Sequence, residues 1–341
     1  MSEKIFVTGG SGFLGSKIIN YLKKQGVDFV NYDLLEPKEF NENYIQGDIL
    51  DKDYLFKSME GCDRVIHCAA SLPLNKYDNN YDKVNVIGTK NIVEASNTLH
   101  VKHFLHISSS AVLGKDHNGL IKEKSERDPF DPYGKSKSIA EEEVEKNLDK
   151  RIKLSIIRPR TIVGISRVGI FGILYDFTRN NLPIFIIGNG KNMLQLIDGD
   201  EIATAISMAS IQQVSGVYNL GNNDMGKLGD LYEDFVNKTN SKSRIVKLPA
   251  TLAIFLLSIL DKLHLSPLAP WHYKSFHVDF AFESSELYKI IGYYPTKSNL
   301  SILLENYNEY IEKETVGSNL STHQSKIPLK LLNIFKLFGR K

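Results

Sequence analysis

The chain has 341 residues, of which 42% are hydrophobic and 24% are charged, a composition typical of a soluble globular protein. Its formal net charge of +2 argues against binding to a nucleic-acid polymer. No apolar signal segment follows Met1, and Cys62 and Cys68 lack metal-ligand spacing. We therefore expect a cytoplasmic protein with reduced, buried thiols and no metal site.

A glycine-rich turn follows the first apolar run. Residues 4–7 predict a buried strand, and the apolar residues beyond the turn recur at helical spacing. Between these elements, Gly9 or Gly10 permits a tight turn. Gly12 lets a pyrophosphate approach the backbone, and Gly15 lets the helix pack close to the strand. The helix N-terminus presents free N–H groups to the phosphates. The sequence therefore predicts a dinucleotide site that includes Gly9, Gly12, Phe13, Leu14 and Gly15.

The second predicted strand, residues 28–32, ends at Asp33. A carboxylate about 20 residues beyond the glycines is placed to accept hydrogen bonds from a ribose diol. Its charge repels a 2′-phosphate, and no arginine lies nearby in the sequence to attract one. We therefore expect NAD rather than NADP as the cofactor. The alternative is that Asp33 is a loop acid that opens a turn before Pro37.

Strand-like and helical runs alternate through the first 160 residues. Strands are expected at 64–67, 103–107 and 154–157, and helices at 84–99 and from about 133 to 144. This alternation predicts an α/β fold with a doubly wound parallel sheet (a Rossmann fold) and ligands beyond the carboxyl ends of the strands.

The pattern is less regular in the second half of the chain. The apolar run 248–260 is too short to cross a bilayer and predicts a core or interfacial helix. Four parts are expected: a mainly NAD-binding core at 1–165, a smaller substrate-binding lobe with returning core elements at 166–313, a polar linker at 314–326, and a basic amphipathic tail at 327–341.

Tyr133 and Lys137 lie four residues apart, on one face of a predicted helix. A neighbouring ammonium lowers a tyrosine pKa, so Tyr133 can exchange a proton with a hydroxyl or carbonyl while hydride moves to or from a nicotinamide. The strand before this helix ends in serines at 108–110, where a hydroxyl can stabilise charge on the reacting oxygen. The alternatives are a helix surface pair and serines that satisfy loop backbone.

Together these stretches resemble the extended short-chain dehydrogenase/reductases of the NAD-dependent epimerase/dehydratase family. The resemblance covers roughly residues 1–313 and rests on Thr8 to Gly15, Asp33, 47–49, 67–70, 85–89, 108–114, 133–137, Arg158-Pro159, 188–190, Asp200 and 292–295. It implies that Ser109 is catalytic together with Tyr133 and Lys137, and that Asn85 supports the site. The further cofactor contacts that it implies are Asp48 and Ile49 at the adenine, Ala69 and Ala70 at the ribose, Lys137 at the nicotinamide ribose, and Pro159.

Departures from the family pattern narrow the expected chemistry. Ser110 and Ala111 stand where the 4,6-dehydratases of the family carry an Asp-Glu pair, so we do not expect a dehydratase, which needs that acid and base. Met193 stands where nucleotide-sugar members often have an arginine for the diphosphate. The residues expected to replace that charge are Arg160, Arg167 and Lys191.

The expected function is that of an NAD-dependent sugar-nucleotide epimerase or oxidoreductase in cell-surface glycan biosynthesis. One alternative is an oxidoreductase of a lipid-like alcohol, similar to 3β-hydroxysteroid dehydrogenases, which Met193 and the run 248–260 favour. Another is a non-catalytic NAD-binding sensor. The resemblance also implies a homodimer. In the tail, apolar and basic sides favour peripheral contact with an anionic inner-membrane surface, although packing on protein fits equally well.

Overall fold

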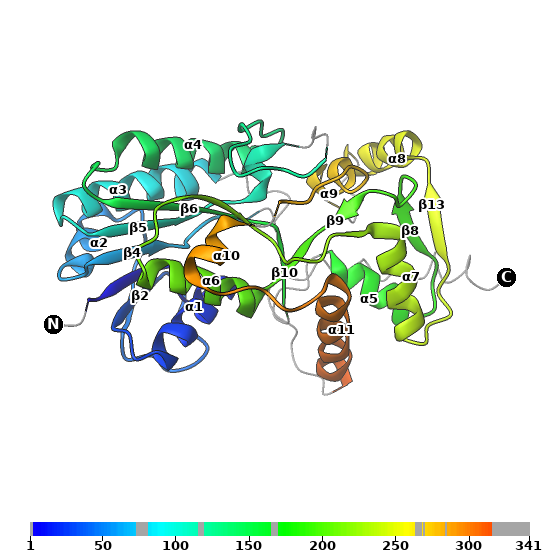
Figure 1. Ribbon diagram of the computed structural model, residues 1–341, viewed down its shortest axis with the longest axis horizontal. Helices are drawn as coiled ribbons and strands as arrows, with labels where there is room; N and C mark the ends of the chain where they lie inside the picture. The colour runs from blue at the N-terminus through cyan, green and yellow to red at the C-terminus, as the bar shows by residue number, and fades with distance from the viewer. Residues whose placement is uncertain are drawn as a thin grey trace.

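The computed structural model describes residues 3–72, 81–114, 119–164, 170–262, 268, 270–283 and 285–315. Within them, a larger part built on a β-sheet and a smaller, mainly helical lobe lie next to each other along the long axis of the molecule (Figure 1). Arg167 and the tail predicted at 327–341 lie outside the described residues. Their expected contacts therefore stay predictions.

The larger part contains a seven-stranded sheet in which every pairing is parallel. The register places Thr8 beside both Tyr32 and His67, so the carboxyl ends of neighbouring strands meet at one edge. This arrangement confirms the predicted Rossmann fold. In spatial order the strands are β11 (Gly216–Leu220), β6 (Lys153–Pro159), β5 (His103–Ile107), β4 (Arg64–His67), β1 (Ile5–Thr8), β2 (Phe29–Asp33) and β3 (Tyr44–Gln46).

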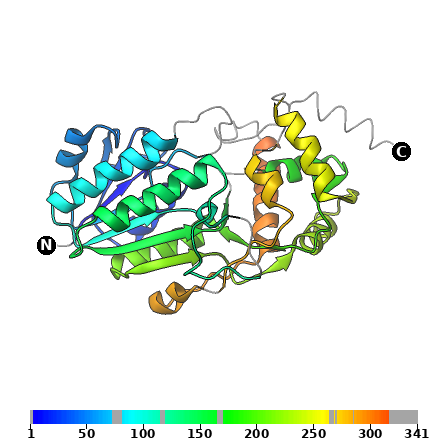
Figure 2. The same cartoon turned by 90° about the horizontal axis from the view of Figure 1, so that it is seen from above.

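Helices cover both faces of this sheet (Figures 1 and 2). Most residues of its central strands are buried, because each face lies under helices. One face carries α1 (Phe13–Lys24), α6 (Gly199–Ile211) and α10 (Glu286–Ile291); the other carries α2 (Lys52–Met59), α3 (Thr89–Thr98) and α4 (Pro132–Asn147).

Two short helical segments lie at the carboxyl edge of the sheet. The helix expected at 84–99 begins two residues earlier, as the π-helix η1 (Asp82–Gly88), and continues into α3. A 3₁₀ turn, η2 (Ser110–Leu113), follows β5 directly. Insertions of π geometry in a helix often mark functional sites.

The smaller lobe has its own core of aromatic and aliphatic side chains. Tyr175 is fully buried there, and its ring centroid lies 5.9 Å from that of Phe235 and 5.6 Å from that of Tyr310. The lobe contains α5 (Phe171–Arg179), α7 (Leu228–Lys238), α8 (Ala250–Lys262), α9 (Pro270–Ser275) and α11 (Asn299–Thr315). Three strand pairs accompany them: β7 (Thr161–Val163) with β10 (Leu196–Asp198), β9 (Met193–Leu194) with β12 (Gly226–Lys227), and β8 (Ile184–Ile187) with β13 (Ile245–Leu248).

Several sequence expectations need correction against these elements. The apolar run expected as a core or interfacial helix forms α8, but Ala253 is the single residue of α8 that is buried, so this is not a core helix. In addition, α11 includes 314 and 315, the first two residues of the expected linker. Both cysteines are free, and Cys68 is only half-buried. None of the helices among the described residues is long and apolar enough to cross a membrane.

Candidate active site

The glycine turn between β1 and α1 is shaped by close contacts within the protein. Gly9 has φ +70°, and a Cβ there would lie 2.7 Å from the Ala69 backbone. A side chain at Gly15 would collide with the Gly9 carbonyl oxygen. At Gly12, however, a Cβ would find its nearest neighbour at 3.2 Å, and no side chain caps the helix that begins after it. The first N–H groups of α1 therefore remain available to an anionic ligand, as a bound pyrophosphate requires.

Asp33 lies beside this turn at the end of β2. Its carboxylate accepts hydrogen bonds from the N–H of Ser11 and of Leu35, each at 2.9 Å. These two bonds orient the carboxylate at the place where the sequence predicts a ribose. The Phe13 ring packs against Gly164 and Gly199. The Leu14 side chain is buried in the core, so we expect Leu14 to contact a cofactor through its backbone.

The residues predicted at the adenine and ribose lie at the same edge of the sheet. The Tyr32 hydroxyl donates a hydrogen bond of 3.0 Å to the Asp48 carbonyl oxygen, and Ile49 packs against Gly88 of η1. The Ala69 N–H, which follows β4, donates to the Thr8 hydroxyl at 3.2 Å. Ala70 is the next residue along this loop and is half-buried. The parallel register thus gathers these positions around the glycine turn.

Tyr133 and Ser109 belong to two segments that pack closely together. Tyr133 lies in the first turn of α4, where Asp131 caps the helix by accepting a hydrogen bond from the Gly134 N–H at 3.1 Å. Ser109 caps η2, and its Oγ accepts from the Ala111 N–H at 3.2 Å. A Cβ at Gly134 would lie 2.5 Å from the Ala111 carbonyl oxygen, so glycine is what allows α4 to approach η2.

Lys137 lies one turn further along α4 and is only 2% exposed. Its Nζ donates a hydrogen bond of 2.6 Å to the Ile107 carbonyl oxygen and lies 3.5 Å from His106 Nε2. Burial lowers the pKa of Lys137 from 10.5 to about 8, and burial together with the charge of Lys137 holds the pKa of His106 well below its usual value. His106 is therefore neutral and can accept from the ammonium. Two of the three Lys137 protons are accounted for, and the third remains for a ribose or phenol oxygen.

A buried hydrogen-bond chain supports the backbone of Tyr133. The Ser136 hydroxyl donates to the Tyr133 carbonyl oxygen at 2.8 Å, and the Asn85 amide donates to the Ser136 hydroxyl at 2.9 Å. The same Asn85 side chain accepts from the Ser71 N–H at 2.7 Å. Because Asn85 is 1% exposed and well satisfied, it links η1 rigidly to α4. This geometry agrees with the supporting role that the resemblance implies.

A cluster of three charges joins α4 to β6, and sequence analysis did not anticipate it. Glu141 is fully buried and accepts hydrogen bonds from Arg158 at 2.9 and 2.6 Å. Arg127 donates to the same carboxylate at 3.1 Å. Burial by itself would raise the pKa of Glu141, but the two arginines hold it below its usual value. The cluster stabilises the end of β6, where Pro159 is buried.

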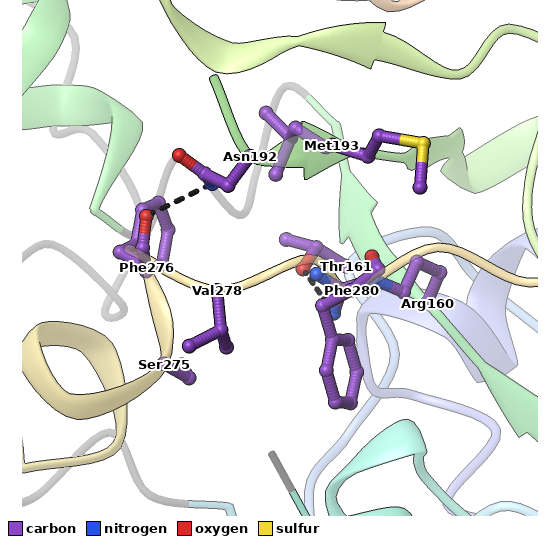
Figure 3. Close-up of a pocket in the computed structure, with 9 residues that line it drawn as sticks. Arg160, Thr161, Asn192, Met193, Ser275, Phe276, Val278 and Phe280 are labelled. Atoms are coloured by element: carbon purple, nitrogen blue, oxygen red, sulfur yellow. Dashed lines mark hydrogen bonds between the residues drawn. The ribbon is translucent and has the colours of Figure 1, made fainter. Parts of the chain in front are cut away.

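A small pocket opens where β6 leaves the sheet (Figure 3). The Arg160 guanidinium is 4.1 Å from the Phe280 ring centroid, and its Nε donates to the Phe280 carbonyl oxygen at 2.8 Å. Arg160 is 8% exposed, and burial lowers its pKa to about 9. No carboxylate in the described part of the chain pairs with it. The other lining residues are Thr161, Asn192, Met193, Leu194, Ser275, Phe276, Val278 and Phe280.

The three expected substrate residues have different outcomes. Arg160 lines this pocket, Lys191 is exposed and is not among the lining residues, and Arg167 lies outside the described residues. Asn192, next to Lys191, lines the pocket. Its amide donates to the Phe276 carbonyl oxygen at 3.1 Å, and its buried Oδ1 has no hydrogen-bond partner among the described residues. Proximity to the glycines at 188–190 could have suggested Asn192, but no sequence signal marks 275–280.

Among the described residues, no cluster of three His, Cys, Asp or Glu side chains fits a metal ion.

Comparisons with known proteins agree with this geometry. Residues 5–221 match the NAD dependent epimerase/dehydratase family. The uncharacterized protein y4nG of Sinorhizobium fredii is 32% identical over 332 residues, which cover 96% of this chain and 84% of that protein. Human sterol-4-alpha-carboxylate 3-dehydrogenase, decarboxylating, is 28% identical over 226 residues, which cover 64% of this chain and 60% of the relative.

Solved structures show the same fold. The Bordetella bronchiseptica enzyme WbmG in complex with NAD and UDP superposes with a TM-score of 0.73 at 18% identity, covering 95% of this chain and 98% of that one. The fold, the glycine turn that leaves room for a pyrophosphate and the family match lead to one conclusion. This chain belongs to the NAD-dependent epimerase/dehydratase family, and its cofactor is NAD.

Proposed function

We propose that this chain is an enzyme that oxidises a hydroxyl of a nucleotide sugar with NAD and then returns the hydride to the opposite face, an epimerase-type reaction. The observation that carries the proposal is Arg160, a buried cation without a carboxylate partner among the described residues. It follows Pro159 directly and lines the pocket at the carboxyl end of β6. A diphosphate is the group of a nucleotide sugar that such a cation binds best.

The proposed roles follow from the chemistry of each side chain. NAD supplies the hydride acceptor. Tyr133 takes the proton of the sugar hydroxyl at its phenol oxygen and returns it in the reverse step. The Ser109 hydroxyl donates a hydrogen bond to the same sugar oxygen, which lowers the cost of charge that develops there. The Lys137 ammonium favours the phenolate of Tyr133 and binds the ribose.

We propose that the reaction does not eliminate water. Elimination needs an additional acid and base near the sugar. Ser110 and Ala111 occupy the first two positions of η2, directly after Ser109, and both are buried. Neither side chain can transfer a proton as a carboxyl group does.

A second candidate is oxidation of a lipid-like alcohol that carries an acidic group. The match to a dehydrogenase of sterol-4-alpha-carboxylates favours it, and so do the apolar side chains Met193, Phe276 and Val278 in the pocket. In this case Arg160 would pair with a carboxylate instead of a diphosphate.

A substrate panel separates the candidates. Purified enzyme with NAD is offered UDP-, dTDP- and GDP-sugars and 3β-hydroxysteroids with and without a 4-carboxylate, while NADH absorbance and product stereochemistry by NMR are followed. An epimerised nucleotide sugar supports the first proposal, and net NADH formation from a steroid supports the second. Failure of every compound to react would favour the non-catalytic NAD sensor.

Two variants test the role of Arg160. Arg160→Gln should weaken nucleotide-sugar binding at least about tenfold, because a charge-assisted hydrogen bond is lost. Lys191→Gln removes a neighbouring positive charge that is exposed and outside the pocket, and serves as the control. Equal loss in both variants would contradict the assignment.

We further propose that the enzyme works in the cytoplasm as a homodimer and supplies nucleotide sugars for cell-surface glycans. The basis is the family resemblance together with the expected substrate class. Cell fractionation and sedimentation of the purified chain test location and assembly, and loss of a surface glycan on gene deletion tests the pathway.

A further inference from the structure

Helix α8 presents a continuous apolar stripe to solvent. Leu252, Phe255, Leu256 and Ile259 are 52%, 62%, 50% and 41% exposed. Their spacing of three, one and three residues places all four on one side of the helix. Large apolar side chains that gather in this way are far less common on a protein surface than isolated ones.

Among the described residues, α8 packs mainly against α9 and β8. Ala253 is the buried residue of the helix, whereas the four side chains of the stripe stay exposed. Figures 1 and 2 place α8 at the outer edge of the smaller lobe, away from the sheet. The stripe is therefore an outward-facing surface of the folded chain.

The size of the stripe does not suit a second copy of the chain. With about 200 Å² for each large side chain, the four exposed fractions amount to roughly 400 Å². A stable protein interface buries about 800 Å² on each partner, about twice this area. A surface of this size on a single helix fits instead the shallow insertion of apolar side chains at a membrane–water boundary.

The charges around the stripe favour an anionic lipid surface. No charged residue occurs in α8 before its last two positions, Asp261 and Lys262. Lys262 is exposed at the end of the stripe, whereas Asp261 lies on the opposite side of the helix and is half-buried. Lys274 is exposed on the neighbouring helix α9, whereas Lys247 on β13 pairs with Glu233 at 3.5 Å. The sequence at 326–341 adds five basic residues and no acidic ones.

We infer that α8 docks the enzyme on an anionic lipid surface, with Leu252, Phe255, Leu256 and Ile259 inserted among the lipids and Lys262 at the headgroups. The exposed Lys262 and Lys274 attract the surface electrostatically. Because α8 packs on α9, which ends at the pocket residue Ser275, the docked surface lies one helix away from the candidate substrate pocket. This inference stands independently of the proposed substrate.

Vesicle flotation tests the inference on the full chain. The probe is a vesicle of phosphatidylcholine with phosphatidylglycerol, compared with phosphatidylcholine alone. Wild-type protein should float with the anionic vesicles, and the double variant Phe255→Glu/Leu256→Glu should lose at least tenfold of the bound fraction. Phe255→Ser should show a smaller loss. Ile290→Glu introduces a single glutamate at a residue of α10 that is 51% exposed, and it should bind as wild type does.

Three results would overturn the inference. Wild-type protein that fails to float would show that the stripe does not bind lipid. A double variant that floats as well as wild type would assign attachment to the tail. A lower sedimentation mass of the double variant, with unchanged circular dichroism, would make the stripe an interface between copies.

Discussion

Lys137 shows at the scale of one residue how the catalytic role proposed for it would oppose stability. Its ammonium is almost completely desolvated. Among the described residues it donates to the Ile107 carbonyl oxygen and to His106, and neither of these groups carries a negative charge. A depressed lysine pKa means that the folded state binds a proton less tightly than the unfolded chain does. The buried ammonium therefore lowers the free energy of unfolding, and the role proposed for Lys137 in binding and catalysis explains why a lysine stands there.

The change Lys137→Met should raise the free energy of unfolding at pH 7 while it removes activity. Below about pH 8 both states of the wild type hold the proton, and the folded state carries the full desolvation cost, on the order of 3 kcal/mol. Between pH 8 and 10.5 the unfolded chain binds a proton that the folded chain does not, so wild-type stability rises with pH. Urea unfolding at pH 7 and pH 10 should therefore show an advantage of the variant that shrinks with pH. Lys135→Met, at an exposed position of α4, should show no such change.

The change Tyr133→Phe should keep NAD binding and lower turnover at least about a hundredfold, because it removes only the transferable proton. NAD affinity is measured by fluorescence titration, and turnover with the substrate found in the panel. Tyr294→Phe, at a tyrosine that is 45% exposed, is the matched control. Activity of the Tyr133 variant within a few-fold of wild type would assign the proton transfer to another group.

At the scale of an element, the glycines of the turn between β1 and α1 serve two purposes. Gly9 and Gly15 are required by the packing of the fold, and we expect Gly12 to be required by the bound NAD. Gly9 and Gly15 have no room for a Cβ because the turn, the strand and the helix meet there. Gly12 has ordinary φ −72° and ψ 176°, which an alanine adopts. A Cβ there would lie 3.2 Å from the Gly9 carbonyl oxygen, a tight contact but a much less severe one than those at Gly9 and Gly15. We therefore expect an approaching pyrophosphate to be the stronger reason for glycine at that position.

Gly12→Ala should therefore lower the free energy of unfolding by at most about 1 kcal/mol and weaken NAD binding at least about tenfold. Thermal melting without NAD measures the first effect, and calorimetric titration with NAD measures the second. Gly226→Ala, where a Cβ would meet no atom within 4 Å, is the control for the substitution itself. A large drop in stability of the Gly12 variant without NAD would contradict this division of roles.

At the scale of the whole molecule, the nucleotide-binding layer is not a continuous stretch of chain. The sheet is completed by β11, which pairs with β6, and one face is covered by α6, whose Ile202 and Ile206 are fully buried. These elements come from the range 166–313. Segments from both 1–165 and 166–313 are therefore needed to bury the core around α1.

A fragment of residues 1–165 should not fold by itself. Without α6 and β11 it would expose the apolar side of α1 and leave β6 as an unpaired edge, which favours aggregation. Far-UV circular dichroism, gel filtration and NAD titration of the fragment test this against the full chain. A soluble fragment with a cooperative melt and NAD binding would show that the first half is autonomous.

Sequence by itself determined the features whose partners are close along the chain. Glycine spacing, the strand that ends at Asp33, the four-residue step from Tyr133 to Lys137 and the alternation of strands and helices all follow from local geometry. They predicted the fold class, the cofactor and the candidate catalytic residues.

The tertiary structure decided the contacts between distant segments. It brings Arg160 against Phe280, Glu141 against Arg158 and His106 beneath Lys137, pairs that no sequence spacing relates. It also separates Lys191, exposed to solvent, from its neighbour Asn192, buried in the pocket. Local preferences specify which elements form, but the burial and charge of each side chain depend on which elements pack against it. For this reason the substrate pocket and the uncovered stripe of α8 emerged only in three dimensions.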